Sequence, residues 1–330
     1  MGSQIVTEEM MIASDTLAIH LFVRNKRRAD LSRFTSDNTV LFVAGSTYPA
    51  STTFDLPLDG LSWMDHLAAQ CNDVYLVDVR GYGSSTRPPE MNAPAGDNAP
   101  VVRTPVAVRD VASAADFVRA RHGLEKINLI GWSWGTSLMS RYAIEHPDAV
   151  NKLVLIAPQW LRETPSLADS GGALGAYRIV DRSAAKARWL NGVPEQSRDA
   201  LLPEAWFEAW ADATFASGQA GPGAGQLIAA NGTVLDSREY WAAGKPLYEP
   251  ERITAPVLIV HAEWDRDCPL DMSRAVFGKL TSAPYRRWVE IGEGTHSVFL
   301  EKNRWQVFGV VDQFFSEGSR VDPEAPAAPR

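Results

Sequence analysis

A serine flanked by two glycines, in residues 131–135 (GWSWG), is the part of this chain best suited to chemistry. It lies between the apolar run 127–130 and a segment with helical character at 137–143. A strand that turns sharply into a helix holds such a serine at the tip of a strained turn, beside the N–H groups of the helix start. Glycines suit this turn because a Cβ at either position would collide with neighbouring backbone. The pattern therefore predicts Ser133 as a nucleophile.

Serine is a weak nucleophile on its own, so it needs a nearby base and an acid that orients that base. After a turn of this kind the expected chain order is serine, acid, histidine. His296 lies in a loop (292–297) between the last predicted strand and helix, at the end of the sheet where ligand sites form. His261 continues a buried strand and is interpreted as a packed histidine. We therefore predict His296 as the base.

Two carboxylates are candidates for the orienting acid, Asp265 and Asp267. Asp265 comes first after the strand end, and we predict it as the acid. Asp267 precedes Pro269 and a helix, so we interpret it as a local partner of the helix N-terminus. Either side chain could instead be an ordinary solvated loop carboxylate.

Short apolar runs alternate with amphipathic segments along most of the chain, which is typical of an α/β fold with a mostly parallel central sheet and helices on both faces. The predicted strands are 5–12, 17–25, 39–44, 74–77, 127–130, 153–157, 255–260 and 286–291, of which the first two form an antiparallel hairpin. The predicted helices of this core are 61–71, 106–121, 137–146, 271–280 and 298–315.

The alternation of buried strands and amphipathic helices stops in the middle of the chain, where no buried strand is predicted. Helical segments at 176–190 and 204–214 alternate there with Gly- and Pro-rich joints. We interpret residues 1–158 and 251–315 as the two parts of one core, and 159–250 as an inserted helical cap. The tail, 316–330, is rich in proline and alanine and is predicted to be unstructured.

Composition narrows the class of protein. The chain has 330 residues, 45% hydrophobic and 22% charged, which is ordinary for a globular protein. A net charge of −8 argues against nucleic acid or anionic membranes as partners. Cys71 and Cys268 have no metal-ligand spacing, so neither a disulfide framework nor a metal site is expected. With no signal-peptide pattern and no long apolar run, a cytoplasmic location is expected.

Together these residues resemble the α/β-hydrolase superfamily with a helical cap, over residues 5–315. The resemblance is carried by 131–135, by the turn 78–84 (DVRGYGS), by Asp265 with Pro269 four residues on, and by 294–296 (GTH). It implies an α/β-hydrolase fold in which Ser133 is the nucleophile, His296 the general base and then acid, and Asp265 its orienting carboxylate.

The resemblance also implies an oxyanion hole and a substrate pocket. One donor would be the N–H of Trp134, and the second the N–H of Ser46, with Thr47 as alternative. The family's usual His-Gly-x is Ala-Gly-Ser at 44–46 here. Thr47, Trp132 and Trp160 are the expected substrate contacts. The cap tryptophans could line an apolar pocket or hold the cap together, and we favour the second for two of them, Trp206 and Trp210.

The implied activity is cofactor-free hydrolysis of a small-molecule carboxylic ester, apolar or aromatic and small to medium in size. The serine at position 133 separates the chain from the dehalogenase and epoxide hydrolase branches, which have aspartate there. The triad spacing resembles that of monoalkyl phthalate hydrolases. Such a substrate carries a free carboxylate, which an arginine can bind, so one cap arginine should face the pocket. The candidates are Arg162, Arg178, Arg182 and Arg188.

Two alternatives remain. The GxSWG pattern resembles proline iminopeptidases, whose HGGPG segment is absent at 44–49; here Glu204, Glu208 or Asp236 would bind the substrate amine. The other is a non-catalytic small-molecule receptor of the same fold.

Overall fold

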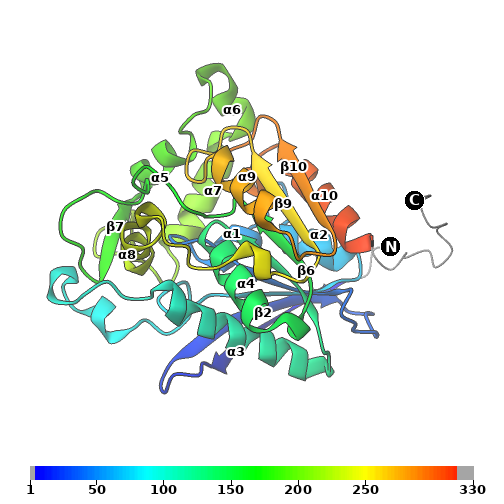
Figure 1. Cartoon of the computed structure of the whole chain (residues 1–330). Coiled ribbons are helices and arrows are strands. Elements are labelled where there is room, and N and C mark those ends of the chain that lie inside the picture. Colours follow the sequence, from blue (N-terminus) through cyan, green and yellow to red (C-terminus); the bar gives the residue numbers. More distant parts are fainter. Residues whose placement is uncertain (1–3, 318–330) are drawn as a thin grey trace.

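The computed structural model describes residues 4–317, and an eight-stranded sheet forms its centre (Figure 1). Its strands are β1 (Ile5–Ala13), β2 (His20–Arg28), β3 (Thr39–Val43), β4 (Asp73–Val77), β5 (Ile127–Trp132), β6 (Val150–Ile156), β9 (Val257–Ala262) and β10 (Arg286–Ile291). They lie in the order β1-β2-β4-β3-β5-β6-β9-β10. The hairpin β1–β2 and the β2–β4 pair are antiparallel, and the other pairs are parallel.

The parallel strands are continuous apolar runs because both faces of the sheet are covered. Every residue of β3, β4, β5 and β9 is buried. Helices α3 (Thr104–His122) and α4 (Trp134–Glu145) pack together on one face, and α2 (Trp63–Ala69) and α10 (Trp305–Ser316) pack together on the other. Helix α1 (Ala50–Phe54) follows the loop after β3, and α9 (Leu270–Lys279) packs on β9. The predicted core strands and helices are thus confirmed, with shifts of a few residues at their ends, except for the last helix.

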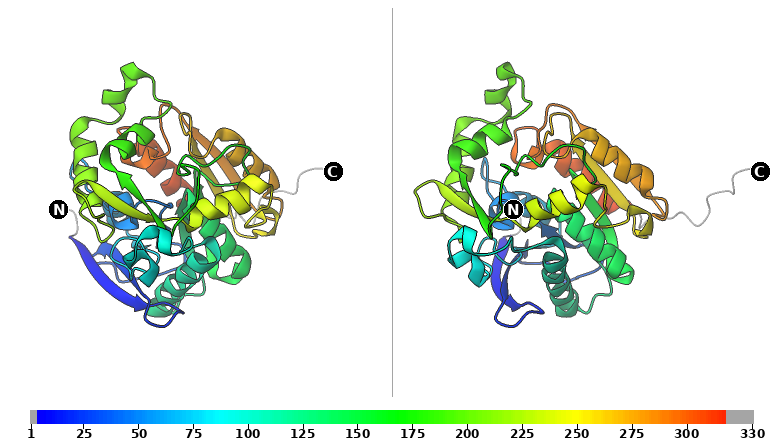
Figure 2. Two further views of the ribbon diagram at one scale, coloured as in Figure 1. Left: turned by 90° about the vertical axis from the view of Figure 1, so that its left-hand side faces the viewer. Right: turned by 60° about the vertical axis from the view of Figure 1, so that its left-hand side comes forward.

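The segment between β6 and β9 differs from the prediction. Besides α5 (Arg182–Trp189), α6 (Arg198–Leu201), α7 (Glu204–Phe215) and α8 (Gly232–Glu239), it contains an antiparallel pair of strands, β7 (Tyr177–Asp181) and β8 (Gln226–Ala230). The helix expected at 176–190 is therefore wrong over its first turns. Pairing with a strand far along the chain, which local periodicity cannot reveal, keeps this stretch extended. Figures 1 and 2 show the segment standing over the sheet, with α6 projecting furthest.

The end of the chain also departs from expectation. The helix predicted at 298–315 is a short 3-10 turn, Val298–Leu300, followed after a break by α10. At the break the buried carboxylate of Glu301 binds back to Thr295, which holds the chain out of helical geometry. Ser316 still belongs to α10, and the rest of the predicted tail, from residue 318, lies outside the described residues.

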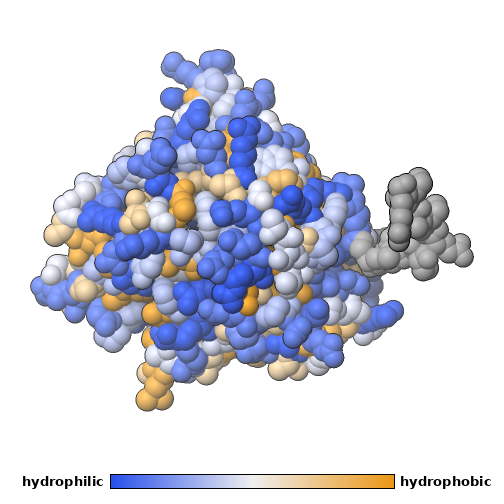
Figure 3. Space-filling view, viewed as in Figure 1, coloured by the Kyte–Doolittle hydropathy of each residue, from blue (hydrophilic) through white to orange (hydrophobic). Residues whose placement is uncertain are grey.

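Aromatic packing joins the inserted segment to the core. The ring of Trp210, fully buried in α7, contacts the rings of Trp189, Phe207 and Phe215 within this segment. It also packs edge-on against Tyr48 of the loop after β3, with ring centroids 4.8 Å apart. The structural role predicted for Trp210 is confirmed. Outside such contacts, polar side chains predominate on the face shown in Figure 3, with apolar ones scattered among them.

Candidate active site

Ser133 lies in the sharp turn between β5 and α4. Its backbone has φ 55° and ψ −121°, a conformation that is strained for a residue with a side chain. The flanking glycines are required by close backbone contacts. A Cβ on Gly131 would lie 2.5 Å from the carbonyl oxygen of Gly135, and one on Gly135 would lie 2.4 Å from the carbonyl oxygen of Val43. The turn has the geometry that the sequence predicted.

His296 and Asp265 meet beside this turn although they come from different loops. Asp265 follows β9, His296 follows β10, and His296 Nδ1 lies 2.8 Å from Asp265 Oδ2. The other carboxylate oxygen accepts the backbone N–H groups of Asp267 and Cys268, both at 2.9 Å. The carboxylate is thereby fixed in place, and it orients the imidazole with Nδ1 toward the acid.

The imidazole is also held by Trp132, which precedes the serine. The indole Nε1 of Trp132 donates to the carbonyl oxygen of His296 at 2.7 Å, and the two ring centroids are 5.0 Å apart. Burial acts to lower the pKa of His296, but the negative charges of Asp265 and Asp267 outweigh it and raise the pKa above its ordinary value. The site thus strengthens this histidine as a base.

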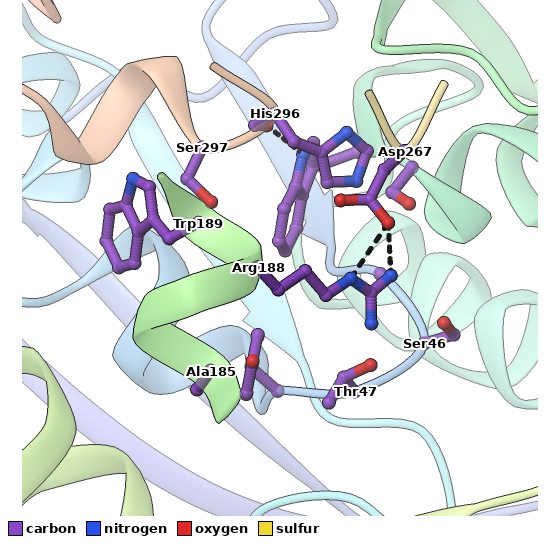
Figure 4. A pocket seen from close by; sticks show the side chains of 12 residues that line it. Ser46, Thr47, Ala185, Arg188, Trp189, Asp267, His296 and Ser297 are labelled. Atoms are coloured by element: carbon purple, nitrogen blue, oxygen red, sulfur yellow. Dashed lines mark hydrogen bonds and ion pairs between the residues drawn. The ribbon is translucent and has the colours of Figure 1, made fainter. Parts of the chain in front are cut away.

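A pocket of about 440 Å³, counted with its open mouth, lies over these residues (Figure 4). Its wall is formed by the loop after β3 (residues 45–48), the β5–α4 turn, the loop of Asp267 after β9, the loop of His296 after β10, and helix α5. The lining residues are Gly45, Ser46, Thr47, Tyr48, Trp132, Ser133, Ala185, Arg188, Trp189, Asp267, His296 and Ser297. The pocket therefore lies at the carboxyl ends of the strands, where α/β folds bind ligands.

The structure brings most of the predicted site residues to this pocket. Ser46, Thr47 and Trp132 line it together with Ser133 and His296. The indole of Trp134 instead points into the core and donates to Thr104 Oγ1 at 2.9 Å, so only its backbone can serve the site.

Trp160 is not among the lining residues. It is buried against Tyr248, with ring centroids 4.8 Å apart. The pocket offers no support for its predicted substrate contact.

Asp267 has a different role from the one expected. Helix α9 begins after Pro269 and has no side-chain cap, so Asp267 is not its N-terminal partner. Its Oδ1 accepts instead from Nε and Nη2 of Arg188 on α5, with the Nε contact at 2.9 Å (Figure 4). Arg188 is therefore the cap arginine that faces the pocket. Asp267 engages the Nε–Nη2 edge of its guanidinium, so a substrate carboxylate would have to bind along the Nη1–Nη2 edge.

Sequence reasoning did not single out Tyr48, Ala185 or Ser297 as site residues, and it considered Trp189 only as one of the cap tryptophans that could line a pocket. Trp189 and Ala185 reach the pocket only because α5 docks over the sheet, which no local pattern predicts. The Trp189 indole is held by the buried carboxylate of Glu301, at 2.8 Å. Tyr48 and Ser297 directly adjoin predicted site residues, which is the one signal that could have found them.

Other reactive groups are few in the described part of the chain. Cys71 and Cys268 are free cysteines, and burial raises the pKa of the Cys268 thiol, which lies beside Ser133, well above its ordinary value. Residues 4–317 contain no cluster of three or more His, Cys, Asp or Glu side chains suited to a metal ion. None of the helices in the same range is long and apolar enough to cross a membrane.

His261 is buried, with Nδ1 3.2 Å from Ser273 Oγ, as predicted for a packed histidine.

The fold and this site define an α/β protein with a strained serine turn after a central strand and a histidine–aspartate pair at the same edge of the sheet. Residues 53–303 match the family described as alpha/beta hydrolase fold. The chain belongs to this family.

Solved structures share the fold at low sequence identity. Epoxide hydrolase I from potato (Solanum tuberosum) is 16% identical, with a TM-score of 0.63 over 95% of this chain and all of that one (100%). An esterase from Exiguobacterium antarcticum is 16% identical, with a TM-score of 0.60 over 93% of this chain and 99% of that one.

Among curated proteins, human 1-acylglycerol-3-phosphate O-acyltransferase ABHD5 is 33% identical over 96 residues. These residues are 29% of this chain and 25% of that relative, so the match spans a quarter of its length.

Proposed function

We propose that this protein is a serine hydrolase that cleaves carboxylic esters through an acyl-enzyme. The observation that carries the proposal is the strained Ser133 turn at the wall of the same pocket as a His296 imidazole bound to Asp265. The likeness of fold to an esterase supports this class of reaction, although at 16% identity it does not identify a substrate.

In the proposed reaction, Ser133 Oγ attacks the ester carbonyl carbon while His296 Nε2 takes its proton. The imidazolium that forms is stabilised by Asp265, which binds its Nδ1–H. When the tetrahedral intermediate collapses, His296 returns the proton to the leaving alcohol oxygen and the acyl group stays on Ser133. His296 then activates water to release the acid and regenerate the serine.

The negative oxygen of the intermediate would be bound by the backbone N–H of Trp134 and by a second N–H from the loop after β3, that of Ser46 or, as the alternative, that of Thr47. Trp134 begins helix α4, where N–H groups are free of helical partners. Ser46 lies in the loop that packs on Ser133. One donor of this kind contributes about 10²- to 10³-fold to the rate in comparable hydrolases.

The pocket supports an ester of small to medium size with an apolar or aromatic group. Tyr48, Trp132 and Trp189 supply rigid aromatic walls, while Thr47 and Ser46 add polar atoms near the serine. A monoalkyl phthalate is one candidate of this size, and the observation in its favour is that Arg188 reaches the pocket.

The test is hydrolysis of p-nitrophenyl acetate and butyrate by the wild type and by Ser133→Ala. We expect turnover by the wild type and at least a 10³-fold loss in the variant, because the nucleophile is removed. If the two proteins are equally active, or both inert, the ester proposal loses its support.

Labelling by a fluorophosphonate, followed by measurement of the intact mass, distinguishes a non-catalytic receptor from a protein with an activated serine. An adduct on the wild type alone demonstrates the nucleophile.

The aminopeptidase alternative has less support in the structure. The acidic residues that could bind a substrate amine are engaged elsewhere: Asp236 binds Arg103 and the Thr104 N–H, while Glu204 and Glu208 pair with Lys186 and Arg182. Asp267, the acidic residue of the pocket, is paired with Arg188. Release of proline from proline β-naphthylamide would nevertheless decide in favour of the peptidase.

A further inference from the structure

The loop after β3, residues 45–48, lies directly against the proposed nucleophile. A Cβ placed on Gly45 would come within 3.1 Å of the Cβ of Ser133. The proposed second oxyanion donor belongs to this loop, so the direction in which its peptide groups point decides whether that donor faces a substrate oxygen. A loop of four residues has little regular structure of its own to fix this direction.

Side chains from outside the loop provide that fixation. The carbonyl oxygen of Ser46 accepts two hydrogen bonds, from the Tyr82 hydroxyl at 2.8 Å and from Arg178 Nη2 at 3.1 Å. Arg178 Nη2 also donates to Thr47 Oγ1 at 2.9 Å, and Gln219 Nε2 donates to the Thr47 carbonyl oxygen at 3.1 Å. Because the peptide group is planar, holding the Ser46 carbonyl also fixes the direction of the Thr47 N–H, the alternative second donor. The Ser46 N–H belongs to the preceding peptide and is restrained through the Cα of Ser46.

Two of these three side chains come from the inserted segment. Arg178 lies on β7, where it pairs with Ala229 of β8, and Gln219 lies in the connection that precedes β8. Tyr82 belongs to the core turn 78–84. The inserted segment therefore does more than cover the pocket, since it holds the backbone of the loop beside the serine.

Arg178 has only uncharged partners, unlike Arg182 and Arg188, which follow it in the chain. Its Nη1 donates to the Ala230 carbonyl oxygen at 2.8 Å, and no carboxylate among residues 4–317 forms an ion pair with it. By contrast, Arg182 pairs with Glu208 and Asp212. Burial lowers the pKa of Arg178 to about 10, so it remains a cation at neutral pH. This uncompensated charge would favour the negative charge that develops on a nearby substrate oxygen.

We propose that Arg178 is a positioning residue for the oxyanion hole: from the inserted segment it holds the Ser46–Thr47 peptide and places a positive charge behind it. The proposal rests on the ester hydrolysis proposed above. It predicts that Arg178 contributes to binding of the transition state and much less to binding of the substrate, which has no full charge on its carbonyl oxygen.

The first experiment compares kcat and KM for p-nitrophenyl butyrate in the wild type, Arg178→Met, Arg178→Lys and the control Arg182→Met. We expect Arg178→Met to lower kcat by about 10- to 100-fold, below the full effect of losing an oxyanion donor, while KM changes little. Arg178→Lys keeps the charge and should recover part of the loss. Arg182→Met removes the ion pairs with Glu208 and Asp212 in the same segment and should retain wild-type kinetics.

A second readout distinguishes positioning from a structural role. Butylboronic acid forms a tetrahedral adduct with an active serine, so its inhibition constant should rise in Arg178→Met in parallel with the loss of kcat/KM. Guanidinium ion added to Arg178→Ala should restore part of kcat, and it should not affect Arg182→Met. Wild-type kcat in Arg178→Met, or a lower kcat with unchanged boronate affinity and no rescue, would overturn the proposal.

Should Arg178→Met fail to fold, Tyr82→Phe decides. This variant removes the other donor to the Ser46 carbonyl and leaves the inserted segment intact, so kcat should fall several-fold with KM unchanged. Unaltered kcat in Tyr82→Phe would then overturn the proposal. If the wild type and Arg182→Met are both inert toward esters, ester hydrolysis itself is refuted. In that case the boronate measurement still tests Arg178 on its own. Equal boronate affinity of the wild type and Arg178→Met would overturn the role proposed for Arg178.

Discussion

Replacing Glu301 with glutamine should change how the stability of the protein depends on pH. The Glu301 side chain is fully buried, with 0% exposure, and its carboxylate accepts from Trp189 Nε1 at 2.8 Å, from the Thr295 N–H at 3.0 Å and from the Thr295 hydroxyl. It thereby joins the pocket wall on α5 to the loop of His296. Burial outweighs these hydrogen bonds and raises the pKa of Glu301 to about 7.

The size of the effect follows from linkage between proton binding and folding. An ordinary glutamate has a pKa of 4.5, and in the folded protein it is about 7. One pKa unit corresponds to about 1.4 kcal/mol, so the rise amounts to about 3 kcal/mol. The folded state binds this proton more tightly than the unfolded state does. The resulting stabilisation is therefore fully present below pH 4.5 and is lost as pH rises to about 7.

Glutamine does not titrate, so Glu301→Gln should lack this dependence. The altered hydrogen bonds of the amide add an offset that is independent of pH. The free energy of unfolding of the variant minus that of the wild type should therefore rise by about 3 kcal/mol between pH 4.5 and pH 8. The sign of the difference at any one pH is less informative than this change.

Urea unfolding at several pH values in this range measures the difference. Tryptophan fluorescence and far-UV circular dichroism should report coincident transitions, which is required for a two-state analysis. Glu290→Gln, a change at an exposed residue of β10, is the matched control for the loss of one negative charge. A difference for Glu301→Gln that stays constant with pH would refute the reasoning.

Three further predictions concern the site and its support. Asp267→Asn removes a charge that raises the pKa of His296, so the acidic limb of the kcat/KM profile should move to lower pH; an unmoved limb would contradict this. Gly135→Ala should destabilise the protein by about 3 kcal/mol or more, because its Cβ would lie 2.4 Å from a backbone oxygen. Gly278→Ala, in open space on α9, should be neutral or gain about 1 kcal/mol, and equal melting temperatures for the two variants would refute the steric argument. If the substrate is a monoalkyl phthalate, Arg188→Ala should lower kcat/KM for the monoester by about tenfold or more relative to kcat/KM for the dialkyl ester, whereas equal effects on both esters would exclude a carboxylate clamp.

The sequence by itself determined the features that depend on short stretches of chain. The apolar runs at β3, β4, β5, β6 and β9 are continuous because these strands are buried on both faces, and such runs are visible without any tertiary contact. The turn at Ser133 is equally local, since two glycines within five residues satisfy its steric demands. The meeting of Asp265 with His296 also followed, because adjacent parallel strands bring the loops at their carboxyl ends together.

Tertiary structure alone decided which partners these residues have. Asp267 is held by Arg188 from α5, rather than by the helix that follows it, because the inserted segment docks over the sheet. Residues 177–181 form a strand because β8 pairs with them, although their local pattern also suits a helix. Glu301 was not assigned any role from the sequence, and Arg178 was named only as one of four candidates for a substrate-carboxylate clamp, since each acts through contacts with segments far away in the chain. Local periodicity reports which face of an element is buried, but not which side chain it is buried against.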